Sequence, residues 1–339
     1  MMKHKLFVKA LWWKEYRQTR VLLWLMLLAS FFPIVYTHMW KLWWASKSMR
    51  DTFVKNVTYV FQDGRAGDNL YNDYGGGLIF IILGSFVLSI WLLGQERRNQ
   101  VNEHMFVLPY PRWILYLTKW MIGIVYIVST IVITLGLDFV VLASSHVSEY
   151  VSIGEIVVRG LHMIFVAVSI YTLTLFLGSF TGTWSMQALM FLLCMTLFDF
   201  LRFVIGKFIH IFMIPVSESA QSVLDGGGWD SFFNVGGWII HEGPGYSYGF
   251  ISIVSILLLL AGMWLYSRNR TENNGKQFVF PVIEKAYTVL GVICAALYGG
   301  YLGYEFFYPG RIGYVCGAGV GAVLCYLIIR TFTHIHTRR

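Results

Sequence analysis

Long apolar runs separated by short polar breaks dominate this chain. Eight runs are long enough to cross a membrane as helices, since about 17 to 25 residues span roughly 30 Å of hydrocarbon. The pattern therefore predicts an all-α integral membrane protein, a polytopic helical bundle of about eight transmembrane helices. The predicted spans are Val21 to Trp40, Gly77 to Gly94, Trp120 to Leu142, Leu161 to Phe180, Met186 to Val204, Phe250 to Tyr266, Ala286 to Phe307 and Ile312 to Thr331.

The breaks between the runs differ in length and character. Thr181 to Ser185 and Tyr308 to Arg311 are so short that each predicts a tight helical hairpin. Residues 205–249 alternate apolar clusters with glycines, which is too apolar for a solvated loop and too broken for a full crossing. We expect this segment to re-enter the membrane as short helices whose backbone is satisfied by other protein groups. A loose Gly-rich loop is the alternative.

Glycines recur at intervals of four residues in the last two spans. Gly313, Gly317 and Gly321 follow this spacing, and Gly299 and Gly303 repeat it on the preceding span. Small residues at this interval let helix backbones approach closely in lipid. The two spans are therefore expected to pack as a pair, against each other or against a partner chain.

Composition agrees with the membrane assignment. Charged residues are 13% of the chain, whereas a soluble domain usually carries about 25%. Aromatic residues are 17%, as expected where rings sit at many membrane boundaries. The net charge of +8 does not indicate nucleic acid, because the basic residues lie at the ends of apolar runs rather than on one face. Val21 to Trp40 is too long for a signal-peptide core, so we expect a retained first span.

The distribution of Lys and Arg predicts an orientation. With the N-terminus inside, 17 of the 26 Lys and Arg residues fall in cytoplasmic segments or at their borders. Positive segments are retained on the cytoplasmic side. An even number of spans also places both termini on one side, so both are expected in the cytoplasm.

Motifs for catalysis, metal binding and nucleotide binding are missing from the sequence. There is no G-x-x-x-x-G-K-[ST] phosphate loop, and the segments between spans are too short for a nucleotide-hydrolysing domain. His241 and Glu242 lack a second histidine at zinc spacing. The four cysteines lie within apolar runs and are read as packing residues. We therefore expect no catalytic residue, no metal and no cofactor on this chain, and any ATP on another subunit.

Ionisable residues within predicted spans are costly, so each is a functional candidate. Asp199 and Arg202 lie three residues apart, on one helical face where they can pair. All the candidates lie toward predicted outer ends, where we expect water to reach them, and structural pairing or snorkelling is favoured over substrate contact. A proton-coupled carrier would place carboxylates nearer the midplane. The candidates are Asp138, Asp199, Arg202 and Glu305.

The predicted inner loop after the second span, residues 95–119, carries an amphipathic pattern. Val101, Met105 and Leu108 are spaced to form one apolar stripe, and charged residues occupy the other face. Pro109 and Pro111 end this helix before the next begins at Arg112. Such a helix, tied to two spans, can transmit a push from a soluble partner; a charged linker is the alternative reading of the same residues.

These residues resemble a known family. Glu96-Arg97-Arg98, then Leu108-Pro109-Tyr110-Pro111-Arg112 and Lys119, look like the intracellular coupling region of ABC transporter permeases of the ABC-2 exporter type, with a longer gap between Glu96 and Leu108. Leu11 to Arg17 is similar to the opening interface helix of that family. The resemblance implies a cytoplasmic amphipathic interface helix at 1–20, a six-span core at 21–270, and an additional two-span extension at 271–339. The interface residues would be Trp13, Lys14, Glu15 and Arg17.

The resemblance also implies a function and partners. The chain would be the permease subunit of an ATP-driven exporter in a bacterial cytoplasmic membrane, paired with a second permease subunit, identical or paralogous. A separate ABC ATP-binding subunit would carry ATP and Mg²⁺. A secondary transporter or channel that needs no ATPase is the first alternative, and an intramembrane enzyme is the second. The coupling residues would be Glu96, Arg97, Arg98, Glu103, Leu108 and Pro109.

Overall fold

The computed structural model describes residues 9–62, 73–95, 110–215, 217, 248–269, 277–307 and 310–337. Over these residues the chain is almost entirely helical, and the one β-bridge joins Thr181 and Phe278. Eight helices are long and apolar enough to cross a membrane. The prediction of an all-α multi-pass membrane protein with eight spans is confirmed.

The first span is a composite helix. It begins as α1 (Lys9–Phe31) and continues through two π-helical segments, η1 (Phe32–Tyr36) and η2 (Trp40–Trp44), which flank the short α2 (Thr37–Met39). No break occurs at residue 20, so the described part of the predicted interface segment continues directly into the span. A separate amphipathic helix, α3 (Lys47–Gln62), follows the span.

The remaining helices follow in chain order. They are α4 (Asp73–Ile90) with its π-helical continuation η3 (Trp91–Gln95), α7 (Arg112–Ala143), the 3-10 turn η4 (Ser148–Tyr150), α8 (Ile153–Phe180), α9 (Trp184–Phe212), α13 (Tyr248–Arg268), α14 (Pro281–Leu302) with its π-helical continuation η6 (Gly303–Phe307), and α15 (Arg311–Thr337). The start of α7 at Arg112 confirms the predicted boundary after Pro111.

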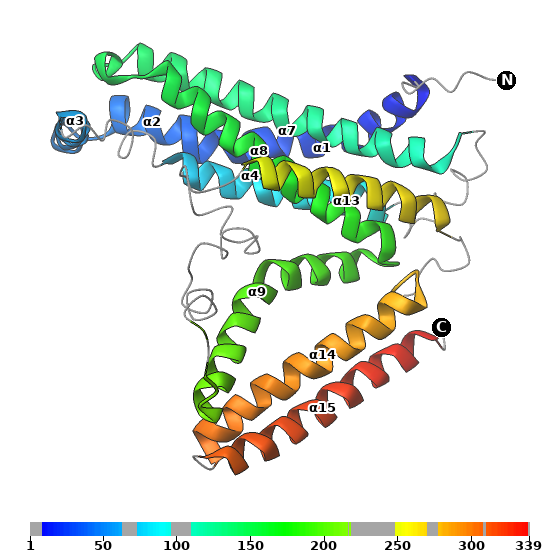
Figure 1. The fold of residues 1–339 in the computed structure, drawn as a ribbon. Coiled ribbons are helices and arrows are strands. Elements are labelled where there is room, and N and C mark those ends of the chain that lie inside the picture. Colours follow the sequence, from blue (N-terminus) through cyan, green and yellow to red (C-terminus); the bar gives the residue numbers. More distant parts are fainter. Residues whose placement is uncertain are drawn as a thin grey trace.

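Five helices, α1, α4, α7, α8 and α13, form one bundle (Figure 1). Helix α8 is the most buried, because α4, α7 and α13 all pack against it. Successive spans alternate in direction, so the beginning of α1 and the end of α15 lie at the same end (Figure 1). We call the end of the bundle at which α1 begins the Lys119 end, and the opposite end the His38 end.

Helices α14 and α15 form an antiparallel hairpin set apart from the bundle (Figure 1). Helix α9 joins the two parts, since it bends between a half that packs on α8 and η3 and a half that packs on α14 (Figure 1). A short backbone pairing anchors the start of the hairpin. The Gly182 amide donates to the Gln277 carbonyl, and the Val279 amide donates to the Phe180 carbonyl, both at 2.9 Å.

The first part of the segment at 205–249 belongs to helix α9. The helix continues to Phe212, and the next residue, Met213, adopts the left-handed conformation that ends it. The first part of the predicted re-entrant segment is therefore the end of the fifth span. Most of the remainder, 218–247, lies outside the described residues.

Candidate functional site

The predicted coupling residues Glu96, Arg97, Arg98, Glu103, Leu108 and Pro109 lie outside the described residues. The structure does describe the two helices that flank this loop, and it describes the part of α1 that was predicted to contact the ATPase. Both lie at the Lys119 end of the bundle.

A buried ion pair joins α1 to α7 at this end. The Lys119 ammonium donates to Glu15 Oε1 at 2.9 Å, and the two side chains are 1% and 2% exposed. Lys14 reaches the same carboxylate oxygen at 3.2 Å from the surface. Burying two charges carries a large desolvation cost. Removing one partner of such a pair therefore strongly destabilises the folded protein, because the other charge stays buried without compensation.

Neighbouring hydroxyls hold the backbone around this ion pair. The Thr19 hydroxyl donates to the Glu15 carbonyl at 2.8 Å and lies 3.0 Å from the Tyr126 hydroxyl. The Tyr171 hydroxyl donates to the Lys119 carbonyl at 2.8 Å. Helices α1, α7 and α8 are thus linked around one buried charge pair.

The predicted interface residues of α1 divide between two faces. Glu15 points into the bundle, whereas Trp13 is 64% exposed and Arg17 is also exposed. Trp13 lies beside Tyr16 on the outer face, with the two rings tilted and their centroids 5.8 Å apart. The four residues therefore form no single contact surface, because one of them serves the interior of the bundle.

The start of α7 is also attached to the end of α13. Arg112 donates from its guanidinium to the Asn269 carbonyl, and Asn269 is fully buried. Within the described part of the chain, the side-chain amide of Asn269 and the hydroxyl of Tyr116 are buried without a hydrogen-bond partner. Such groups are uncommon in folded proteins and often contact ordered water. This end of the bundle is therefore polar in its interior.

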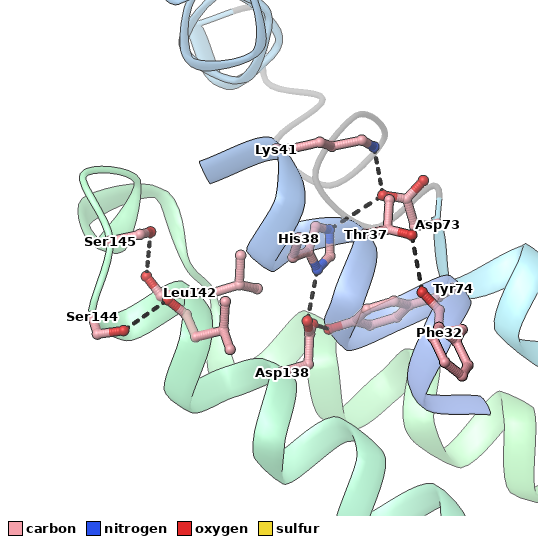
Figure 2. A network of polar contacts seen from close by, with 11 residues as sticks. Phe32, Thr37, His38, Lys41, Asp73, Tyr74, Asp138, Leu142, Ser144 and Ser145 are labelled. Atoms are coloured by element: carbon pink, nitrogen blue, oxygen red, sulfur yellow. Dashed lines mark hydrogen bonds and ion pairs between the residues drawn. The ribbon is translucent and has the colours of Figure 1, made fainter. Parts of the chain in front are cut away.

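A second buried cluster lies at the His38 end (Figure 2). His38 Nδ1 is 2.7 Å from Asp138 Oδ1, and the Tyr74 hydroxyl donates to Asp138 Oδ2 at 2.7 Å. His38 Nε2 is 3.5 Å from Asp73 Oδ2, which accepts a hydrogen bond from Lys41 at 2.6 Å. His38, Tyr74 and Asp138 are fully buried. Three consecutive spans meet in this cluster.

The irregular helix around His38 has an identifiable cause. Pro33 lies in η1, and a proline inside a helix lacks an amide donor and crowds the preceding turn. The chain adopts wider π turns on both sides of α2, and the Thr37 hydroxyl donates to the Phe32 carbonyl at 3.1 Å (Figure 2). Such π segments occur frequently at functional sites. They set the position of His38 opposite Asp138.

The four predicted intramembrane polar residues have different environments. Asp138 is paired, as favoured, but it is fully buried, so the expectation that water reaches it is wrong. Asp199 and Arg202 do pair, at 3.7 Å, and both are partly exposed. Glu305 is exposed on η6. Of the four, Asp138 alone lies within the buried core of the described bundle.

The two buried clusters lie near opposite boundaries of the apolar layer. A rise of about 1.5 Å per residue puts Lys119 and Asp138 about 28 Å apart along α7. That separation is close to the hydrocarbon thickness of roughly 30 Å. Exposed tryptophans mark both ends as well, with Trp13 and Trp113 near Lys119 and Trp44 near His38.

Sequence reasoning did not identify His38, Tyr74 or the buried position of Glu15. A histidine inside an otherwise apolar run was the available signal for His38. Among the described residues, no group of three or more His, Cys, Asp or Glu side chains is arranged to hold a metal ion. No family model, curated protein or solved structure matches this chain.

Proposed function

We propose that this chain is the permease subunit of an ATP-driven exporter of the ABC-2 type. ATP and Mg²⁺ are bound by a separate ABC ATP-binding subunit, which docks on the loop at residues 96–109 and on the start of α1. The observation that carries the proposal is the buried ion pair between Glu15 and Lys119, because it joins the two segments that would receive the ATPase.

The ion pair makes α1 and α7 respond together. Helix α7 begins at Arg112, directly after the loop, and Lys119 lies two turns further along. Glu15 lies on the segment of α1 that precedes the membrane core. A displacement of the loop therefore acts on both helices, since separating them would leave a buried carboxylate without its ammonium partner.

The other side of the loop is attached to α8 and α9. Gly94, at the end of η3, packs so closely on Trp184 that a Cβ atom there would lie 2.7 Å from the Trp184 Cβ. Gln187 of α9 donates to Ser89 at 3.2 Å and to the Thr174 carbonyl at 3.0 Å. Movement of the loop would thus reach α9, and through α9 the α14–α15 hairpin. This connection supports the proposal that displacement of the loop moves both the five-helix bundle and the α14–α15 hairpin.

The partners and location follow from the same proposal. The subunit pairs with a second permease subunit, identical or paralogous, and is surrounded by lipid in a bacterial cytoplasmic membrane. Both termini face the cytoplasm, with the Lys119 end inside. The Lys and Arg distribution supports this orientation, since basic segments are retained on the cytoplasmic side.

The test is ATP hydrolysis by the purified assembly. The chain, coexpressed with its ATP-binding subunit and placed in lipid vesicles, is expected to show vanadate-sensitive ATPase activity that depends on the permease. The variant R97E/R98E is expected to weaken subunit association by roughly tenfold or more, because charge reversal places like charges together. Thermal unfolding of the variant chain alone should match that of the wild type.

A matched control is available at the opposite end. Lys47 and Arg50 lie on α3, on the His38 side, and K47E/R50E introduces the same change of charge. This control is expected to retain wild-type association and ATPase activity. Transport by the isolated chain in vesicles under an ion gradient, without any ATPase, would overturn the proposal and support a secondary carrier or channel.

A further inference from the structure

Two arginines lie between two tryptophans on the exposed face of α1, at the Lys119 end. We propose that this face, residues 13–24, is a binding site for an anionic phospholipid, whose headgroup phosphate is held by Arg17 and Arg20. The inference does not depend on the proposed function, because it concerns the outer surface of α1 and is tested with this chain alone.

The four side chains share one face of the helix. They are Trp13, Arg17, Arg20 and Trp24. Successive members are four, three and four residues apart, a spacing that places neighbours on the same side of an α-helix. All four are exposed, and each tryptophan is 64% exposed. Helices α4 and α7 pack against α1, whose buried residues lie on the opposite side. The two arginines therefore face away from the bundle.

The arginines lie at the boundary of the apolar layer. The apolar run of the first span begins at Val21, directly after Arg20, and Arg17 lies about one turn further out. The headgroup region of a bilayer begins where the hydrocarbon ends, so lipid phosphates lie at this level. Tryptophans are enriched at the same boundary. Trp13 lies about one turn outside Arg17, and Trp24 lies about one turn inside Arg20.

Carboxylates of the surrounding helices lie elsewhere. Helix α1 has one acidic residue, Glu15, which points into the bundle and pairs with Lys119 at 2.9 Å. The acidic residues of α4 and α7, Asp73 and Asp138, lie at the His38 end. In these three helices, therefore, no carboxylate faces the arginines. A cation at a lipid-facing surface is stabilised by an anion, and the phosphate of an anionic lipid is the anion present there.

The chemistry of the face suits both parts of a phospholipid. The guanidinium of an arginine is planar and donates two parallel N–H hydrogen bonds to phosphate oxygens. Arg17 and Arg20 are about 4.5 Å apart along the helix axis, so both can reach one phosphate. Further into the layer the same side of α1 presents apolar side chains, Val21, Leu25 and Leu28, which are 65%, 55% and 51% exposed. These side chains contact the acyl chains.

The test is the binding of phosphatidylglycerol to the purified full chain in detergent, titrated by native mass spectrometry. We expect the wild-type chain to bind this lipid more tightly than the zwitterionic phosphatidylcholine. R17Q/R20Q is expected to weaken the binding by roughly tenfold or more, because two cations are removed from the site. Millimolar inorganic phosphate should leave the lipid bound. Displacement by inorganic phosphate would show a site for a soluble anion and would overturn the proposal.

Helix α3 supplies the matched control, since K47Q/R50Q removes two cations at the His38 end. This variant is expected to keep the wild-type affinity for phosphatidylglycerol. A photoactivatable phosphatidylglycerol, reactive near its headgroup, should label residues 13–24 of the wild-type chain, which gives a readout that needs no variant. Wild-type affinity in R17Q/R20Q, an equal loss in K47Q/R50Q, or labelling confined to other segments would each contradict the assignment.

Discussion

The five-helix bundle and the α14–α15 hairpin are held together in different ways. In the bundle, buried polar side chains connect helices: Ser30 lies 2.9 Å from Thr134, and Trp120 donates to Thr172 at 2.9 Å. In the hairpin, the contact is backbone against backbone. A Cβ atom on Gly299 would lie 2.6 Å from the Gly317 carbonyl oxygen. Apolar side chains give little preference for protein over lipid, so both devices replace a hydrophobic driving force.

The difference separates a part that responds to charge from a part that keeps its shape. Side-chain contacts such as Glu15 with Lys119 and His38 with Asp138 depend on a charge or on a polar hydrogen-bonding group. A glycine contact depends only on the absence of a side chain. We therefore expect signals to act on the bundle and the hairpin to move as a rigid arm attached through α9.

The largest effect is expected from breaking the ion pair at the Lys119 end. K119M leaves the Glu15 carboxylate buried without its main partner, which should lower the free energy of unfolding by about 3–5 kcal/mol. Chemical unfolding in detergent measures this loss. In E15L/K119M neither charge remains, so much of the stability should return. Equal instability of the single and double variants would show that packing, rather than charge, holds this junction.

The second effect concerns the His38 end. Y74F removes the hydroxyl that donates to Asp138 at 2.7 Å, and a hydrogen bond to a charged group is worth about 1.5–3 kcal/mol. The same unfolding experiment should show a loss of this size. Tyr36 is partly exposed, at 37%, so Y36F should leave stability unchanged. An unchanged unfolding free energy in Y74F would contradict the view that side-chain hydrogen bonds stabilise the bundle.

The third effect tests the hairpin. G299V places a side chain against the backbone of α15, where overpacking costs roughly 1–3 kcal/mol. We expect α14 and α15 to separate locally, with lower hydrogen-exchange protection in both helices and unchanged protection in α8. Gly319 has open space around it, which makes G319V the matched control. Loss of protection in G319V as well would show that the valine itself, and not the close contact, disturbs the hairpin.

The smallest effect is expected where a pair is exposed. Asp199 and Arg202 lie on α9, at 3.7 Å, and Asp199 is 47% exposed. R202Q should change the unfolding free energy by less than about 1 kcal/mol, because exposed ion pairs contribute little. A loss comparable to that of K119M would place this pair among the buried contacts of the bundle.

The predictable part of the fold follows from local patterns. The apolar runs gave all eight spans, and the four-residue glycine spacing gave the pairing of the last two helices, which Gly299 and Gly317 now show directly. Both features depend on residues close in sequence. The helical continuation of α9 to Phe212 was harder to predict, because the glycines that follow it gave the whole segment an interrupted pattern.

The two buried clusters could not be predicted from local sequence patterns. Glu15 and Lys119 are 104 residues apart in sequence, and His38 and Asp138 are 100 apart. Their pairing depends on how α1 packs against α7, and nothing within either helix specifies that register. The π turns around His38 had only Pro33 as a signal. For this reason Asp138 was expected near water, while its actual partner was not identified.

The most direct measurement of the proposed coupling is a distance between the two parts of the molecule. Spin labels are placed at Gln18, an exposed residue of α1, and at Val282, an exposed residue at the start of α14. In the assembly with the ATP-binding subunit, trapping with ATP and vanadate is predicted to shift the distance distribution, and R97E/R98E is predicted to abolish the shift. A distribution that ATP and vanadate leave unchanged in the intact assembly would contradict the account.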